Sequence, residues 1–235
     1  MSQLKVNTIR HTGASSDAIT LAADGTAAIG ECTAKVTNNL SNRNLIINGA
    51  FQIAQRGTSS TTAGFGSVDR FQCSFGGGQE NCTHSQHDLT SSDTGPWAAG
   101  FRKSFHLQNG NQTSGAQGND FAYISYGIEA QDIANSGWNY NSASSYITLS
   151  FWVKSSVAGQ QYVYFYCSDG TAQGYSFDAG VLSANTWTKV THSIPGHANL
   201  TFNNDTGIGM SIYWGPHWGD DMTDSGHTLN TWAAY

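Results

Sequence analysis

Three segments of the chain alternate apolar side chains with other residues at a period of two, and this pattern constrains the fold more than any other feature. They span residues 146–154, 161–167 and 208–214. Because successive side chains of a β-strand point to opposite faces, each segment predicts a strand with one buried face. The residues expected in the core include Leu149, Phe151, Val163, Phe165 and Ile212.

Further strand-like stretches surround these segments. They lie at residues 45–47, 68–74, 101–107, 121–126 and 187–194. Several end at turn signals such as Asn48-Gly49 and the triple glycine at 76–78. One helical turn is expected at 128–133. Short strands joined by such turns are typical of an antiparallel β-sandwich, so the sequence predicts an all-β fold.

The charge balance argues against two classes of partner. The chain has 10 Lys and Arg against 16 Asp and Glu, a net charge of −6, whereas a nucleic-acid binder normally presents a basic face. No apolar run approaches the roughly 20 residues of a membrane-spanning helix. The sequence therefore predicts neither nucleic-acid binding nor membrane insertion.

Two of the four cysteines, Cys73 and Cys82, lie symmetrically about the triple glycine. A hairpin there would bring them close together. The cysteines lack the paired spacing of a zinc site, and the N-terminus lacks the apolar stretch of a signal peptide. The sequence therefore favours free thiols.

Residues 1–42 differ in kind from residues 43–235. They hold short strand-like pieces at 4–6 and 18–21, separated by Gly and Ser, and too few apolar residues for a core of their own. Such a segment must find partners elsewhere, so we expect an extended β segment that serves in attachment or trimerisation. An unstructured tail is the competing interpretation.

The most specific stretch of the chain is 42–58 (NRNLIINGAFQIAQRGT), followed by 68–71 (VDRF). It resembles the opening of jelly-roll domains in tail-fibre and appendage proteins of marine bacteriophages, and 146–154 and 187–190 are also similar to that family. The resemblance implies a trimeric virion protein whose residues 43–235 form a jelly roll like that of carbohydrate-binding modules. Such domains usually carry a further closing strand, which we expect beyond residue 235.

This resemblance and the absence of catalytic motifs predict a non-enzymatic virion structural protein. We expect a tail fibre or tail appendage that contributes to host attachment. Its expected partners are two further copies of itself in a homotrimer, other virion proteins such as a tail adaptor or nozzle, and a host surface glycan. The alternatives are a capsid decoration or head-fibre protein bound to the capsid, and a carbohydrate-binding or polysaccharide-degrading receptor-binding protein.

Aromatic side chains are the candidate glycan contacts. If the core assignment holds, Trp152, Tyr162, Tyr164 and Tyr166 point away from the core, and Trp218 lies beside a Gly-Pro turn. Aromatic rings stack on sugar rings, and their polar atoms find hydrogen-bond partners. Contact with another subunit or a second layer competes with sugar stacking for these residues and is the favoured alternative.

A calcium site is the only cofactor that the sequence raises. Asp220, Asp221 and Asp224 lie in one loop and offer the oxygen ligands that Ca²⁺ prefers, although solvated loop carboxylates are the favoured interpretation. His84 and His87 are three residues apart in a strand-like context. They would face opposite sides, so we do not expect them to bind a metal together.

Overall fold

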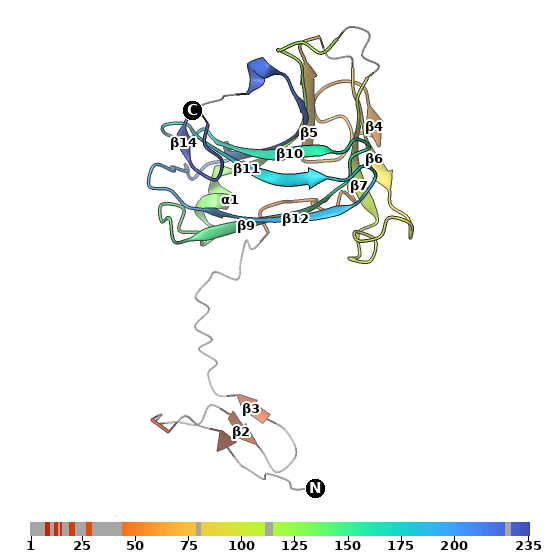
Figure 1. Ribbon diagram of the computed structural model, residues 1–235. Coiled ribbons are helices and arrows are strands. Elements are labelled where there is room, and N and C mark those ends of the chain that lie inside the picture. The colour runs from red at the N-terminus through yellow and green to blue at the C-terminus, as the bar shows by residue number, and fades with distance from the viewer. Residues whose placement is uncertain are drawn as a thin grey trace. The chain divides into compact units, whose positions relative to one another are not determined.

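A computed structural model describes residues 8–9, 12–13, 15, 19–21, 27–29, 44–78, 81–110, 115–223 and 227–235 (Figure 1). The chain divides into two units, Met1–Leu40 and Ser41–Tyr235. In the first unit, three short strands form an antiparallel sheet: β1 (Thr8–Ile9), β2 (Ile19–Leu21) and β3 (Ala27–Ile29). The strand-like piece expected at 4–6 lies outside the described residues.

The second unit consists almost entirely of strands. Its strands are β4 (Ser59–Ser60), β5 (Phe71–Gly76), β6 (Thr83–Asp88), β7 (Lys103–Gln108), β8 (Phe121–Glu129), β9 (Tyr146–Val153), β10 (Gly159–Cys167), β11 (Gln173–Leu182), β12 (Thr188–Pro195), β13 (Ile208–Trp218) and β14 (Ala233–Ala234). Two short helical elements accompany them, α1 (Ala130–Ala134) and the 3₁₀ turn η1 (Asp220–Met222). Neither described helix is long and apolar enough to cross a membrane.

Three antiparallel sheets build this unit. The largest has the strand order β14-β11-β10-β13-β8-β5, and the others are β12-β9 and β4-β6-β7. In Figure 1, β9 and β12 form a layer below β10 and β11, while β4, β6 and β7 lie toward one end. The architecture is all-β and sandwich-like, as the alternating segments predicted.

The core confirms the predicted faces. Leu149, Val163, Phe165 and Ile212 are buried, and Phe151 is partly buried against the same cluster. The cluster draws residues from the six-stranded sheet and from β9 and β12, so it lies between these layers. Burial of this apolar area, at about 25 cal/mol per Å², is the main favourable term in the stability of such a sandwich.

The strand expected at 45–47 is absent, and that prediction is wrong. The backbone of 45–47 is bonded to side chains instead of a neighbouring strand, since the Ile46 N–H donates to Asn44 Oδ1 at 3.0 Å and the Ile47 N–H to the Tyr126 hydroxyl at 2.8 Å. Asn48, which follows, adopts φ 60°. Its Oδ1 accepts the backbone N–H of Ile53 at 3.0 Å, and its Nδ2 donates to the carbonyls of Ile53 and Asp69 at 2.9 Å each. Leu45 and Ile46 still pack against the core.

The hairpin expected about the triple glycine does not form either. Strand β5 pairs with β8, whereas β6 pairs with β4 and β7, so the two strands belong to different sheets. Cys73 and Cys82 are nevertheless both buried. Burial, with a smaller contribution from the neighbouring Cys82, raises the pKa of the Cys73 thiol to about 12.

Candidate functional site

The outward face of the six-stranded sheet carries a cluster of aromatic side chains, which we call the aromatic face. Its members are Phe121 and Tyr123 of β8, Tyr164 and Tyr166 of β10, Tyr213 and Trp218 of β13, and Tyr235 beyond β14. Six of them are half-buried, and Tyr235 is exposed. Large aromatic side chains gathered on one outward sheet surface are typical of a contact or binding site.

Strand alternation places these rings on the outward side. Val163 and Phe165 point into the core, so Tyr164 between them must point out. The register pairs Tyr164 with Tyr213 across β10 and β13, and pairs Tyr213 with Ser125 across β13 and β8. Residues paired across antiparallel strands share a face, so the sheet itself brings tyrosines from distant parts of the chain together.

The rings form one continuous row across the strands. Tyr164 stacks on Tyr213 with centroids 5.8 Å apart, and Tyr213 meets Tyr123 edge to face at 5.2 Å. Tyr123 stacks on Trp218 at 5.2 Å. At the other end, Tyr235 lies 5.0 Å from the Tyr166 ring and 6.4 Å from the Tyr164 ring. These spacings are those of favourable aromatic pairs, so neighbouring rings hold each other in place.

Two glycines leave room for the row. The Tyr164 ring lies across Gly174, where an added Cβ would be 2.8 Å from the phenol oxygen. The indole of Trp218 lies directly against Gly215, next to an irregularity in the pairing of β13 with β8. Any larger residue at Gly174 or Gly215 would displace a ring of the aromatic face.

The aromatic face combines apolar rings with uncharged polar groups. Burial raises the pKa of both Tyr164 and Tyr213, so both phenols stay protonated at neutral pH. The Tyr164 hydroxyl is buried and has no hydrogen-bond partner among the described residues. The residues paired with these tyrosines, or next in the same rows, are Gln72, Ser125, Ser176 and Ser211. Rings flanked by hydroxyl and amide groups can stack on an apolar surface and hydrogen-bond a hydroxylated ligand.

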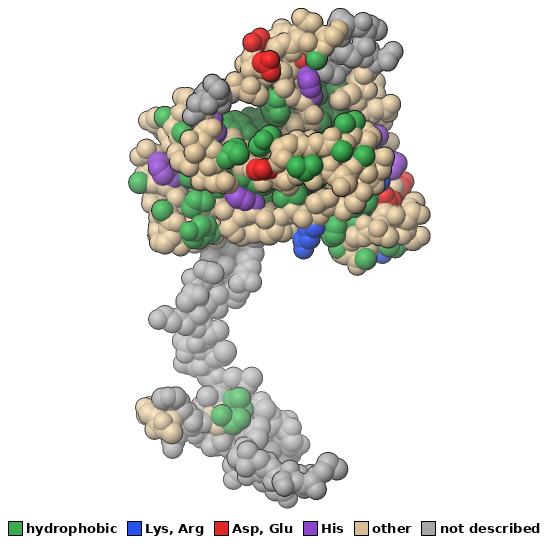
Figure 2. All heavy atoms as spheres, viewed as in Figure 1, with side chains coloured by type: hydrophobic (Ala, Val, Ile, Leu, Met, Phe, Trp, Pro, Cys, Tyr) green, Lys and Arg blue, Asp and Glu red, His purple; other side chains and the backbone are tan. Residues whose placement is uncertain are grey.

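The space-filling view shows that the surface over this sheet is hollowed. In Figure 2 a hollow lies beside β10, and the side chains visible at its bottom are hydrophobic. A concave, largely apolar surface with a few polar groups is the usual form of a ligand site.

Three of the five predicted glycan contacts meet on the aromatic face, namely Tyr164, Tyr166 and Trp218. Tyr162 points to the same side of β10 and is 45% exposed, but it makes no ring contact among the described residues. Trp152 lies on β9 in a different sheet, and its ring packs where a Cβ on Gly95 would be, at 2.6 Å. The structure therefore separates Trp152 from the tyrosines.

The sequence prediction omitted four members of the face, Phe121, Tyr123, Tyr213 and Tyr235. A signal existed for Tyr213, because it alternates with the core residues Ile212 and Trp214 in the segment 208–214. Tyr123 alternates in the same way within β8. What the sequence lacked was the order of the strands, which makes β8, β13 and β10 neighbours.

The predicted calcium ligands lie near one end of the aromatic face. Asp220 and Asp221 belong to η1, which begins two residues after Trp218, and both are exposed. Asp224 lies outside the described residues. No group of three or more His, Cys, Asp or Glu side chains is placed to hold a metal ion in the described part of the chain. A calcium ion bound by this loop stays a prediction.

A buried Ser–His pair lies apart from this surface. His84 donates from Nε2 to the Thr62 carbonyl at 2.9 Å, and its Nδ1 is hydrogen-bonded to the Ser67 hydroxyl at 2.7 Å. Both side chains are almost completely buried, which leaves no access for a substrate. The pair therefore serves packing. His87 is exposed on the other face of β6, beside His106 with ring centroids 5.5 Å apart.

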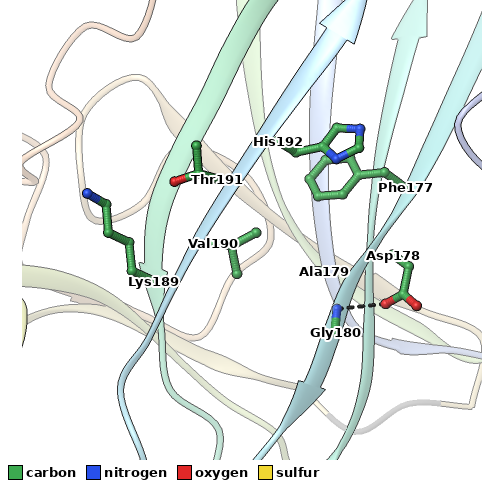
Figure 3. A pocket seen from close by; sticks show the side chains of 8 residues that line it. All are labelled: Phe177, Asp178, Ala179, Gly180, Lys189, Val190, Thr191 and His192. Atoms are coloured by element: carbon green, nitrogen blue, oxygen red, sulfur yellow. Dashed lines mark hydrogen bonds between the residues drawn. The ribbon is translucent and has the colours of Figure 1, made fainter.

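An open groove of about 360 Å³ runs between β11 and β12 (Figure 3). The His192 ring lies flat on Phe177 with centroids 4.0 Å apart, and its Nε2 is 2.9 Å from the Tyr175 hydroxyl. Lys189 and Asp178 extend on different sides of the groove, as Figure 3 shows. Its polar groups do not converge on one point, so it is a weaker ligand site than the aromatic face.

Comparisons with protein-family models, with curated proteins and with solved structures gave no match for this chain.

Proposed function

We propose that this protein is a non-enzymatic attachment protein that binds glycans through the aromatic face, as a subunit of a virion appendage. The observation that carries the proposal is the continuous row of rings from Tyr235 to Trp218, flanked by serine and glutamine side chains. Such a row offers several stacking positions in line, as an extended chain of sugars requires. We further propose that the sandwich is a jelly roll. β9 and β12 lie in one layer, whereas β10, β11 and β13 lie in the other, so the chain crosses repeatedly between the layers. Neighbouring strands in the six-stranded sheet are also often not consecutive in the chain.

The same surface has a second possible use, as a contact between copies of the chain. Exposed apolar surface commonly marks protein interfaces, and Tyr235 at 83% exposed and Tyr162 at 45% exposed extend this surface. The two uses differ in what they predict. If the face is a subunit contact, removing a ring should prevent assembly. If it is a glycan site, removing a ring should weaken sugar binding and leave assembly intact.

A glycan array with matched variants tests the proposal. Tyr213→Ala removes the ring that bridges Tyr164 and Tyr123, and Tyr146→Ala removes an exposed ring on β9 in the other sheet. We expect the wild type and Tyr146→Ala to bind the same glycans, and Tyr213→Ala to lose about tenfold in affinity, the equivalent of one aromatic contact. Thermal melting checks that both variants are folded. Equal binding by all three proteins contradicts the proposal, and loss of assembly in Tyr213→Ala assigns the face to a subunit contact.

For residues 1–42 we propose attachment to the virion, with the sandwich presented as a homotrimer. Support comes from the separate N-terminal unit and its short antiparallel strands, since short strands can add to the sheet edge of a neighbour. Deleting residues 1–42 should leave the sandwich folded, judged by its melting temperature, and should abolish incorporation into particles. Normal incorporation of the truncated protein would place the anchor elsewhere.

A further inference from the structure

Charge is distributed unevenly around the aromatic face. The cross-strand row through its centre reads Ser176, Tyr164, Tyr213, Ser125 and Gln72. The next row contains Tyr166 and Ser211 with two glycines. Neither row contains a Lys or Arg residue.

Carboxylates, by contrast, lie at the margins of this surface. Asp178 pairs with Tyr162 at one side, and Asp220 and Asp221 follow Trp218 at the other. Arg70, at another margin, pairs with Glu129 at 3.3 Å and adds no net positive charge. In Figure 2 the visible Lys and Arg side chains lie along the lower part and right side of the sandwich, away from the hollow, whereas some of the acidic side chains lie nearer to it.

We infer that the aromatic face selects uncharged glycans and rejects sulfated or uronate-rich ones. The inference depends on the proposed function and narrows it to a class of ligand. An anionic polysaccharide would need cationic partners, and the two central rows provide neutral hydroxyls, an amide and aromatic rings, with the His227 imidazole edge to face with Tyr164 at 6.3 Å between ring centroids. The marginal carboxylates and the net charge of −6 would also repel it. A neutral sugar chain meets no such penalty.

The phenols keep this character over a wide pH range. Because burial raises the pKa of Tyr164 and Tyr213 above that of an ordinary tyrosine, both remain uncharged well into alkaline solution. Binding should therefore change little between about pH 8 and pH 9, where an ordinary phenol is also protonated.

Matched pairs of polysaccharides test the selectivity. The full chain is titrated with agarose oligosaccharides and the same oligosaccharides after chemical sulfation, and with dextran and dextran sulfate, beside a general glycan array. We expect neutral members to bind at least about tenfold more tightly than their anionic partners, since like charges across an interface cost more than a tenfold change. Binding should also vary less than about twofold between 0.05 and 0.5 M NaCl, because salt screens charges and not stacking.

A gain-of-function variant sharpens the test. Gln72→Lys adds one positive charge to the central row at nearly constant side-chain length, and Gln108→Lys adds the same charge to β7 in another sheet. Only Gln72→Lys should gain affinity for the sulfated partner, in a salt-dependent way. Tighter binding of anionic glycans by the wild type overturns the inferred class and leaves the glycan site intact. Failure of the wild type to bind any neutral or anionic glycan overturns the proposed function itself.

Discussion

Replacing Asn48 should lower the free energy of unfolding of the sandwich by more than the replacement of a half-exposed residue usually does. The Asn48 side chain makes three hydrogen bonds, one from Ile53 N–H and two to the carbonyls of Ile53 and Asp69. Each intramolecular hydrogen bond contributes about 1 kcal/mol net to stability. Its φ of 60° adds about 1 kcal/mol for a residue less tolerant of the left-handed region.

Asn48→Ala should therefore lower the free energy of unfolding by about 3 to 4 kcal/mol. Asn48→Gly should cost about 2 to 3 kcal/mol, because glycine adopts the left-handed conformation freely and loses only the hydrogen bonds. For a domain of this size, 3 kcal/mol lowers the melting temperature by about 6 to 12 °C.

Urea titration with linear extrapolation measures these free energies. Asn185→Ala is the matched control, since Asn185 has φ 56° in an exposed turn and its side chain makes no hydrogen bond among the described residues. That variant should cost only about 1 kcal/mol. Equal losses from Asn48→Ala and Asn185→Ala would refute the reasoning, because they would show that the three side-chain bonds contribute nothing.

Three further predictions follow from the same structure. Asp93 accepts hydrogen bonds from Trp187, Lys154 and Thr90, which hold its pKa far below the ordinary value; Asp93→Asn should cost about 1 to 2 kcal/mol at pH 7. A carboxyl group whose pKa is lower in the folded state stabilises the fold at pH values above its pKa in the unfolded chain, which is near 4. The urea midpoints of the wild type and Asp93→Asn should therefore converge as the pH falls toward the pKa of the folded state. Gly215→Ala should displace Trp218 and weaken glycan binding. Gly159→Ala is the control, because an added Cβ there meets open space, and it should leave binding unchanged when both variants are titrated with the same glycan. Gly174→Ala should move Tyr164 and change tyrosine fluorescence more than Gly159→Ala does; identical spectra would count against the close packing of that ring.

Local alternation was enough to predict the strands and the core faces of β9, β10 and β13. Side chains of a strand alternate between its two faces, so once the apolar face is buried Val163 and Phe165 must both point into the core. Strand β11 was not predicted, since Gly174, Asp178 and Gly180 interrupt its apolar pattern and the pairing with β10 shifts at Gln161 and Tyr162. Such an irregularity changes which residues face inward partway along a strand.

The composition of the candidate site depended on contacts between distant segments. Tyr123 and Tyr213 join Tyr164 only because β13 lies between β8 and β10, and no local pattern encodes that order. Trp152 shows the opposite case: its strand was predicted, yet a loop containing Gly95 covers its outward ring. The stretch 42–58 also contains Asn48, whose side chain bonds to the carbonyl of Asp69. The sequence pattern did not predict this structural role.

The position of a bound sugar is the most direct test of glycan binding by the aromatic face. NMR spectra of the protein with labelled aromatic rings, recorded during titration with an array-selected oligosaccharide, would locate it directly. The account predicts that the signals of Tyr123, Tyr164 and Tyr213 shift together, while those of Trp152 and of His192 in the groove stay unchanged. Shifts that gather around the β11–β12 groove or Trp152 and spare the three tyrosines would contradict it.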